Sequence, residues 1–252
     1  LGLIGVFMAT LVVLYFYSLR YQTYYSLRDD ANVLQIALPE MIEAEQHFIS
    51  LESKSTQFLL EGESTNLQRY HQQSFAIRQF IHNFEQATLL KKLGMHTSLK
   101  NVKKLLERHH EVFMDLAGKL RLRGFKEYGL EGKMREAIHR LQALRILDNV
   151  NLLTLRKHEK DFFLRKDDNY SDTLHATAQN LIAATKEKIR KDAQDRLMPL
   201  PVDTLLQTQV QTLVQEYLNQ FDRIAATEKI IGQQGSRLGL YGEIDETTTQ
   251  IK

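Results

Sequence analysis

The residue types best suited to chemistry lie together in one stretch, Leu152 to Arg165 (LLTLRKHEKDFFLR). Within it, Glu159 is spaced three to four residues from Leu155 and Phe162, so on a helix it shares their apolar face. A carboxylate on such a face must be paired or protonated, because burying an unpaired charge is costly. The sequence therefore predicts that Glu159 is at least partly buried and bonded to a basic residue, Arg156 or an arginine of a neighbouring helix.

Two interpretations of this stretch stay open at the sequence level. In the first, Glu159 belongs to a satisfied structural network inside a helical bundle. In the second, it lines a polar pocket for a small charged ligand, whose contacts would include Arg156, Lys160 and Arg165 of the same run.

Signatures of enzymatic chemistry are weak. Gly132 and the lysine after it suggest a phosphate-binding loop, but Glu127 and Met134 stand where that loop needs glycine and Ser or Thr. The chain has no cysteine, and its nine histidines include no pair at metal-binding spacing; His109 and His110 are adjacent and point in different directions on a helix. We therefore expect no catalytic residue, no metal and no cofactor.

Composition favours a helical protein without a nucleic-acid partner. The formal net charge is only +2 over 252 residues, so a basic binding surface for nucleic acid is not indicated. There are 12 glycines and 3 prolines, fewer turn residues than a β-rich chain of this length needs. Long helices are therefore expected.

The first 17 residues carry no charge and are apolar enough for a membrane helix. Tyr15 and Tyr17 lie at the end of this stretch and Arg20 follows it, as aromatic and cationic anchors do at a membrane interface. We predict a transmembrane helix over 1–19, truncated at its start, in preference to a cleaved signal peptide or a buried core helix.

Beyond this anchor the apolar spacing is helical almost throughout. The predicted helical segments are 18–62, 66–92, 97–122, 130–167, 171–198, 203–231 and one that starts near 240. If every break between them reversed the chain, the last segment would run away from the membrane, so one break is expected to be a kink.

An internal repeat is visible on self-comparison. Gly129-Leu130-x-Gly132 recurs as Gly239-Leu240-x-Gly242, 110 residues later, and apolar positions from Leu51 to Leu60 recur from Leu155 to Leu164, 104 residues later. The repeat predicts that the two matched helices superpose, with Phe58 and its counterpart Phe162 both facing a core.

The predicted fold is all-α, with two stacked four-helix bundles that share long helices, preceded by the transmembrane helix. The repeat units are about 20–128 and 129–238, and the segment 130–167 is expected to be shared between the bundles.

The run from Leu155 to Arg165, with Gly129-Leu130-x-Gly132 before it and Gly239-Leu240-x-Gly242-Glu243 after it, resembles the helical bimodular sensor domain. That resemblance covers nearly the whole chain after the anchor. Members of the family lie between two transmembrane helices in chemoreceptors and sensor histidine kinases, form two stacked helical bundles, dimerise, and bind small metabolites such as organic acids.

For this chain the resemblance implies a sensor domain over 20–252, on the periplasmic or extracellular side of the inner membrane, with a second membrane helix soon after Lys252. It implies a homodimer and a small-molecule ligand. Family members grip organic acids with basic residues early in the first helix, where this sequence has Arg20, expected at the interface, and Arg28, a candidate ligand contact.

The second copy departs from the family pattern, with Asp245 and Thr249 where the first copy has Arg135 and His139. The alternative function is a structural helical spacer, or a docking module for a periplasmic binding protein, without a small-molecule site. A spacer should have dry apolar cores, whereas a sensor should carry charged groups inside its bundles.

Overall fold

The computed structural model describes residues 33–86, 96–196 and 200–251, and all regular structure in these ranges is helical, as predicted. A helix over 33–47 leads into a π-helical turn. The later elements are η1 (Phe48–Glu52), α2 (Thr56–Glu61), α3 (Thr65–Gln86), α5 (His96–Arg123), α6 (Gly129–Ala143), α7 (Asn149–Arg165), α8 (Asp168–Asp195), α9 (Pro201–Ile231) and α10 (Gly239–Ile251).

The predicted membrane helix over 1–19 lies outside the described residues. Within the described ranges, the length and hydropathy of every helix fall short of what a bilayer crossing needs.

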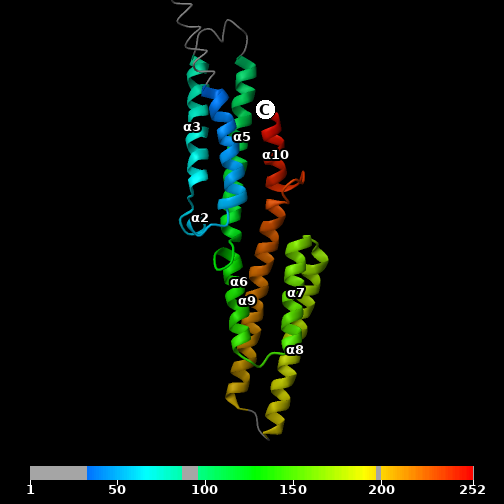
Figure 1. Cartoon of the computed structure of the whole chain (residues 1–252). Coiled ribbons are helices and arrows are strands. Elements are labelled where there is room, and N and C mark those ends of the chain that lie inside the picture. The colour runs from blue at the N-terminus through cyan, green and yellow to red at the C-terminus, as the bar shows by residue number, and fades with distance from the viewer. Residues whose placement is uncertain (1–32, 87–95, 197–199, 252) are drawn as a thin grey trace, which may run out of the picture. The chain divides into compact units, whose positions relative to one another are not determined.

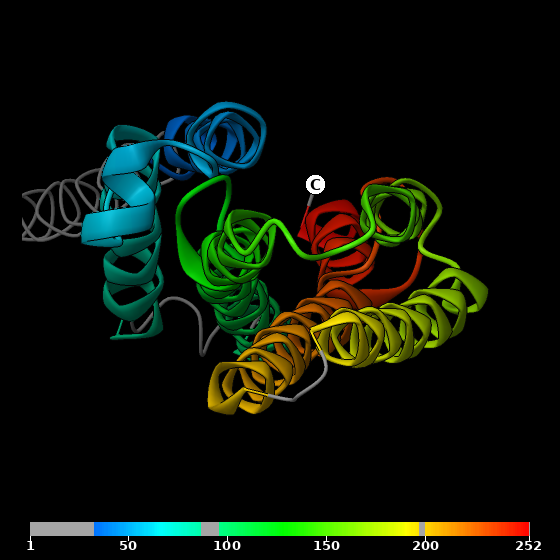
Figure 2. The same ribbon diagram turned by 90° about the horizontal axis from the view of Figure 1, so that it is seen from below.

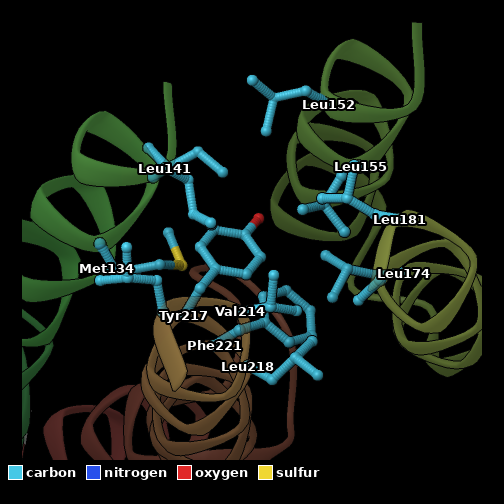
Figure 3. Packing of buried hydrophobic residues seen from close by; sticks show 14 of the residues in the cluster. Met134, Leu141, Leu152, Leu155, Leu174, Leu181, Val214, Tyr217, Leu218 and Phe221 are labelled. Atoms are coloured by element: carbon cyan, nitrogen blue, oxygen red, sulfur yellow. The ribbon is translucent and has the colours of Figure 1, made fainter. Parts of the chain in front are cut away.

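The chain divides into two compact units, and residues 53–62 and 112–246 form the one called unit 2. Its core is built by α6, α7, α8 and α9: α9 packs against both α6 and α8, and α8 packs against α7 (Figure 2). Buried side chains of all four helices meet in one cluster, which includes Leu141, Leu155, Leu181 and Phe221 (Figure 3).

Helix α9 shows how the sequence produces this core. Its buried positions Val210, Val214, Tyr217 and Phe221 recur at three- to four-residue spacing, so they form one apolar stripe. Pro201 occupies the first turn, where a missing backbone N–H costs no hydrogen bond. The stripe therefore fixes which face of α9 is turned inward.

Unit 1 contains, of the described residues, 33–52, 63–86, 96–111 and 247–251. Its interior holds large side chains from three helices and from the π-helical turn, among them Met41, Phe48, Tyr70 and Leu106. It also encloses ionisable groups.

The two Gly-Leu-x-Gly motifs begin α6 and α10 with the same backbone conformation. Gly129 and Gly239 have φ values of 64° and 71°, and a Cβ on them would lie 2.6 Å from the Cα of Gly124 and 2.7 Å from the Cα of Gly232, respectively. Only glycine fits such a left-handed position with backbone so close. The repeat therefore extends from sequence to local geometry.

Each of the two motifs is preceded by a glycine loop, over 124–129 and over 232–239. Neither glycine loop reverses the chain. Within unit 2, α6 continues the direction of the last turns of α5, and α10 sets out in the direction of α9 (Figures 1 and 2). The sequence predicted that one inter-helix break would be a kink without saying which, and two of the breaks keep the chain direction.

Two predicted helices are interrupted. The segment 130–167 is not one helix, because α6 ends at Ala143 and α7 begins at Asn149 after Asp148, whose carboxylate accepts hydrogen bonds from the first backbone N–H groups of α7. The segment 18–62 breaks after Glu52, and Ser55 caps α2 by accepting from the Phe58 N–H at 3.2 Å. A single helix shared between two bundles over 130–167 is therefore wrong.

The predicted burial of Phe58 and Phe162 is confirmed, but Leu51–Leu60 does not form one helix that could superpose on Leu155–Leu164. Phe58 and Phe162 are both buried, each 2% exposed. The helices that carry them differ, however, since Leu51 lies in the π-helical turn and is 71% exposed, whereas Leu155 lies within α7 and is fully buried.

Candidate functional site

Helix α7 carries the stretch that the sequence singled out. Leu152, Leu155 and Phe162 are buried along one face, and Glu159 lies half-buried between them, as its spacing predicted. Position 159 therefore places a carboxylate at the edge of the unit 2 core.

The partner of Glu159 is a tyrosine of α9. The Tyr217 hydroxyl donates a hydrogen bond to Glu159 Oε2 at 2.7 Å. Figure 3 shows the Tyr217 ring among aliphatic side chains, with its oxygen directed toward the helix that carries Leu155. The predicted bond to a basic residue is wrong: within the described ranges Glu159 forms no ion pair, and its hydrogen bond is to the buried phenol.

Burial sets the electrostatics of this pair. It raises the pKa of Glu159 above the ordinary value of 4.5, while the Tyr217 hydrogen bond and the charge of Arg156 act in the opposite direction. Burial, followed by the negative charge of Glu159, raises the pKa of Tyr217 well above 10.0. The phenol therefore keeps its proton and remains the donor.

Of the other residues predicted to contact a ligand, only two lie near Glu159. Arg156 is half-buried and close enough to Glu159 to act on it electrostatically, as does the exposed Lys160. Arg165 instead lies over the ring of Tyr170, 5.3 Å from its centroid. Arg28 lies outside the described residues. The roles of these residues in ligand binding stay predictions.

Unit 2 has further polar groups inside it that sequence reasoning missed. The buried atoms Arg135 Nε on α6 and His158 Nδ1 on α7 have no hydrogen-bond partner among the described residues. Unsatisfied buried nitrogens are rare in native proteins and require an explanation, such as a bound molecule.

An ion cluster around one buried carboxylate lies near the glycine loops. Glu228, 8% exposed, binds Arg123 Nη1 at 3.2 Å through one carboxylate oxygen and Lys166 Nζ at 2.8 Å through the other. The cluster connects the C-terminal ends of α5, α7 and α9. Lys166 ends α7 in a left-handed conformation with φ 54°.

Unit 1 encloses a second group of ionisable side chains. His109 on α5 is fully buried, with its Nε2 2.8 Å from Glu45 Oε2 and its Nδ1 2.9 Å from Thr247 Oγ1. Sequence reasoning set His109 aside with His110, although its spacing from Leu106 and Phe113 places it in an apolar stripe. That spacing was the available signal.

The rings of Tyr70 and His110 stack beside His109, with the phenol oxygen 3.3 Å from His110 Nδ1. Burial and the charge of Arg78 lower the pKa of His110 to about 4, so this imidazole is neutral at physiological pH. Burial and the negative charge of Glu45 raise the pKa of Tyr70 above its ordinary value.

These features define an all-helical protein with ionisable side chains inside its apolar cores. Comparison of the chain with protein-family models, with curated proteins and with solved structures finds no match in any of the three.

Proposed function

We propose that this chain is the extracytoplasmic ligand-sensing domain of a bacterial transmembrane receptor. In this proposal residues 1–19 anchor it in the inner membrane, and 20–252 form two stacked four-helix bundles. The domain binds a small metabolite such as an organic acid, and signals as a homodimer through a small displacement of the membrane helices.

The observation that carries the proposal is the presence of charged groups inside the helical cores. A spacer needs only apolar packing, and each buried ionisable group costs desolvation free energy. Glu159 is nevertheless half-buried, and the buried atoms Arg135 Nε and His158 Nδ1 have no hydrogen-bond partner within the described ranges. An acidic ligand bound beside Arg156 would pair with its guanidinium, and one that reached Arg135 Nε or His158 Nδ1 would satisfy that nitrogen.

Signalling follows if the ligand binds one packing of the helices better than another. It then shifts the equilibrium by its differential affinity for the two states. Within unit 2 the helices on either side of each glycine loop keep one direction, which suits this role.

The docking alternative also has an observation in its favour. The aliphatic side chains of Val150, Leu153 and Leu164 on α7 are 69%, 65% and 80% exposed. Exposed aliphatic side chains on one helix favour contact with a protein partner. In that case the charged interior would be structural only.

A thermal-shift screen of the 252-residue chain in detergent, against organic acids and amino acids, separates the two functions. A ligand at 100 times its dissociation constant stabilises the folded state by about 2.7 kcal/mol, which raises the melting temperature by about 5–10 °C. If no compound of either class raises it, the sensor proposal is rejected in favour of the spacer or docking module.

A matched pair of variants locates the site. Arg156→Gln should abolish the shift, whereas Arg140→Gln should keep it, because the Arg140 side chain is 53% exposed and pairs with Glu216 at the surface. A shift that survives Arg156→Gln would place the ligand elsewhere.

A further inference from the structure

His109 is held at both ring nitrogens by side chains from two other helices. Glu45 belongs to the helix over 33–47, the first in the described part of the chain, and Thr247 belongs to α10, the last. His109 is 0% exposed, Glu45 2% and Thr247 8%, so water does not compete for these contacts. One buried imidazole therefore connects helices that are 200 residues apart in the sequence.

The proton positions follow from the chemistry of the three groups. His109 Nε2 and Glu45 Oε2 lie 2.8 Å apart, within ion-pair distance, although neither atom makes a hydrogen bond of good geometry. A carboxylate only accepts, so this contact is favourable when Nε2 bears a proton. With Nε2 bare, the lone pairs of a nitrogen and a carboxylate oxygen would face each other in a buried site, which is costly. Nδ1 then accepts from the Thr247 hydroxyl, or donates to it if the ring is charged, because a hydroxyl does both.

The bond to Thr247 restrains the rotation of the imidazole, and this rotation sets the 2.8 Å separation of Nε2 from Glu45 Oε2. Tyr70 also contacts the ring, in a tilted arrangement with centroids 6.5 Å apart. A change at α10 therefore reaches the first helix through the orientation of one ring.

We infer that His109 is a positioning residue that couples α10 to the helix over 33–47, so that a change in the Thr247 contact alters the stability of the first helix. This coupling goes beyond ligand recognition, and it rests on contacts within unit 1 alone. A ligand screen without a hit would therefore not contradict the coupling.

Amide hydrogen exchange on the 252-residue chain in detergent tests the coupling. Thr247→Val removes the hydroxyl while keeping the volume, and it should accelerate exchange in residues 37–47 by about five- to tenfold, as expected for the loss of one hydrogen bond. The control Thr185→Val removes an equally buried hydroxyl, which bonds Leu181 O of its own helix at 2.7 Å, and should leave that segment unchanged.

Two further variants keep the test decisive if Thr247→Val folds poorly. Thr247→Ser retains the hydroxyl and should exchange like the wild type. In a His109→Gln background, adding Thr247→Val should not accelerate exchange in residues 37–47 any further, since the ring that transmits the change is gone. Faster exchange confined to α10, acceleration by Thr247→Ser, or additive effects in the double variant would each overturn the coupling.

Discussion

Replacing Tyr217 by phenylalanine removes one oxygen atom from the unit 2 core and leaves the ring in place. The lost interaction is the 2.7 Å hydrogen bond to Glu159 Oε2. Because a hydrogen bond to a charged group contributes about 1.5–3 kcal/mol, Tyr217→Phe should destabilise the chain by that amount at pH 7. Glu159→Ala should cost about 1–3 kcal/mol, the penalty of a buried phenol without an acceptor.

The pH dependence of the free energy of unfolding gives a stronger test. Burial raises the folded-state pKa of Glu159 above 4.5, so ionising this carboxyl opposes folding. The penalty is absent below pH 4.5 and grows as pH rises through the folded-state pKa. Glu159→Gln keeps an acceptor for Tyr217 without the charge. It should equal the wild type near pH 4 and be at least as stable at pH 7.

Urea unfolding followed by circular dichroism, at pH 4, 5, 6, 7 and 8, measures these differences as midpoint shifts at constant slope. Tyr170→Phe is the control, since Tyr170 lies half-buried at the α8 surface under Arg165 and its hydroxyl should contribute less than about 0.5 kcal/mol.

Two results would refute this reasoning. A cost of Tyr217→Phe that is the same at pH 4 and pH 7 would mean that the hydrogen bond does not involve a carboxylate. A Glu159→Gln variant that is less stable than the wild type by more than about 1 kcal/mol at pH 7 would mean that a cation stabilises the charge, as the sequence had suggested.

Three other predictions use the same unfolding assay. Gly129→Ala should cost at least about 1–2 kcal/mol, because φ is 64° and backbone lies within 2.6 Å of the new Cβ, whereas Gly118→Ala, in open space on α5, should gain about 0.5–1 kcal/mol. Phe162→Ala should cost about 3–5 kcal/mol and the exposed Leu164→Ala less than about 0.5 kcal/mol; equal effects would contradict the assigned burial. Glu228→Gln should cost about 2–3 kcal/mol by leaving two cations unpaired, and an unchanged midpoint would show that the cluster is not formed.

Periodicity predicted the α7 stripe but not the partner of its carboxylate. The positions of Leu155, Glu159 and Phe162 on one face follow from local spacing alone. The donor, Tyr217, lies 58 residues further along the chain. Its ring faces α7 only because α8 packs back against α7 and α9 packs back against α8. Nothing local distinguishes this tyrosine from the other nine.

The missed helix breaks have a similar physical origin. The residues between α6 and α7, Leu144 to Asp148, include no glycine or proline, and Arg145 adopts the left-handed conformation that glycine usually supplies. Asp148 was the available sign, since its side chain accepts from two backbone N–H groups. The breaks at the glycine loops were predicted correctly, because tight left-handed turns require glycine, which is visible in the sequence.

Three left-handed positions in the described part of the chain are occupied by larger residues, at Lys126, Arg145 and Lys166. Each carries a backbone penalty of about 1–2 kcal/mol that glycine would relieve. Lys166 alone of the three binds the buried Glu228, so the same exchange there would discard an ion-pair partner. Sequences that diverge from this one are therefore free to accept glycine at 126 and 145, while position 166 should resist the replacement for as long as a carboxylate persists at 228.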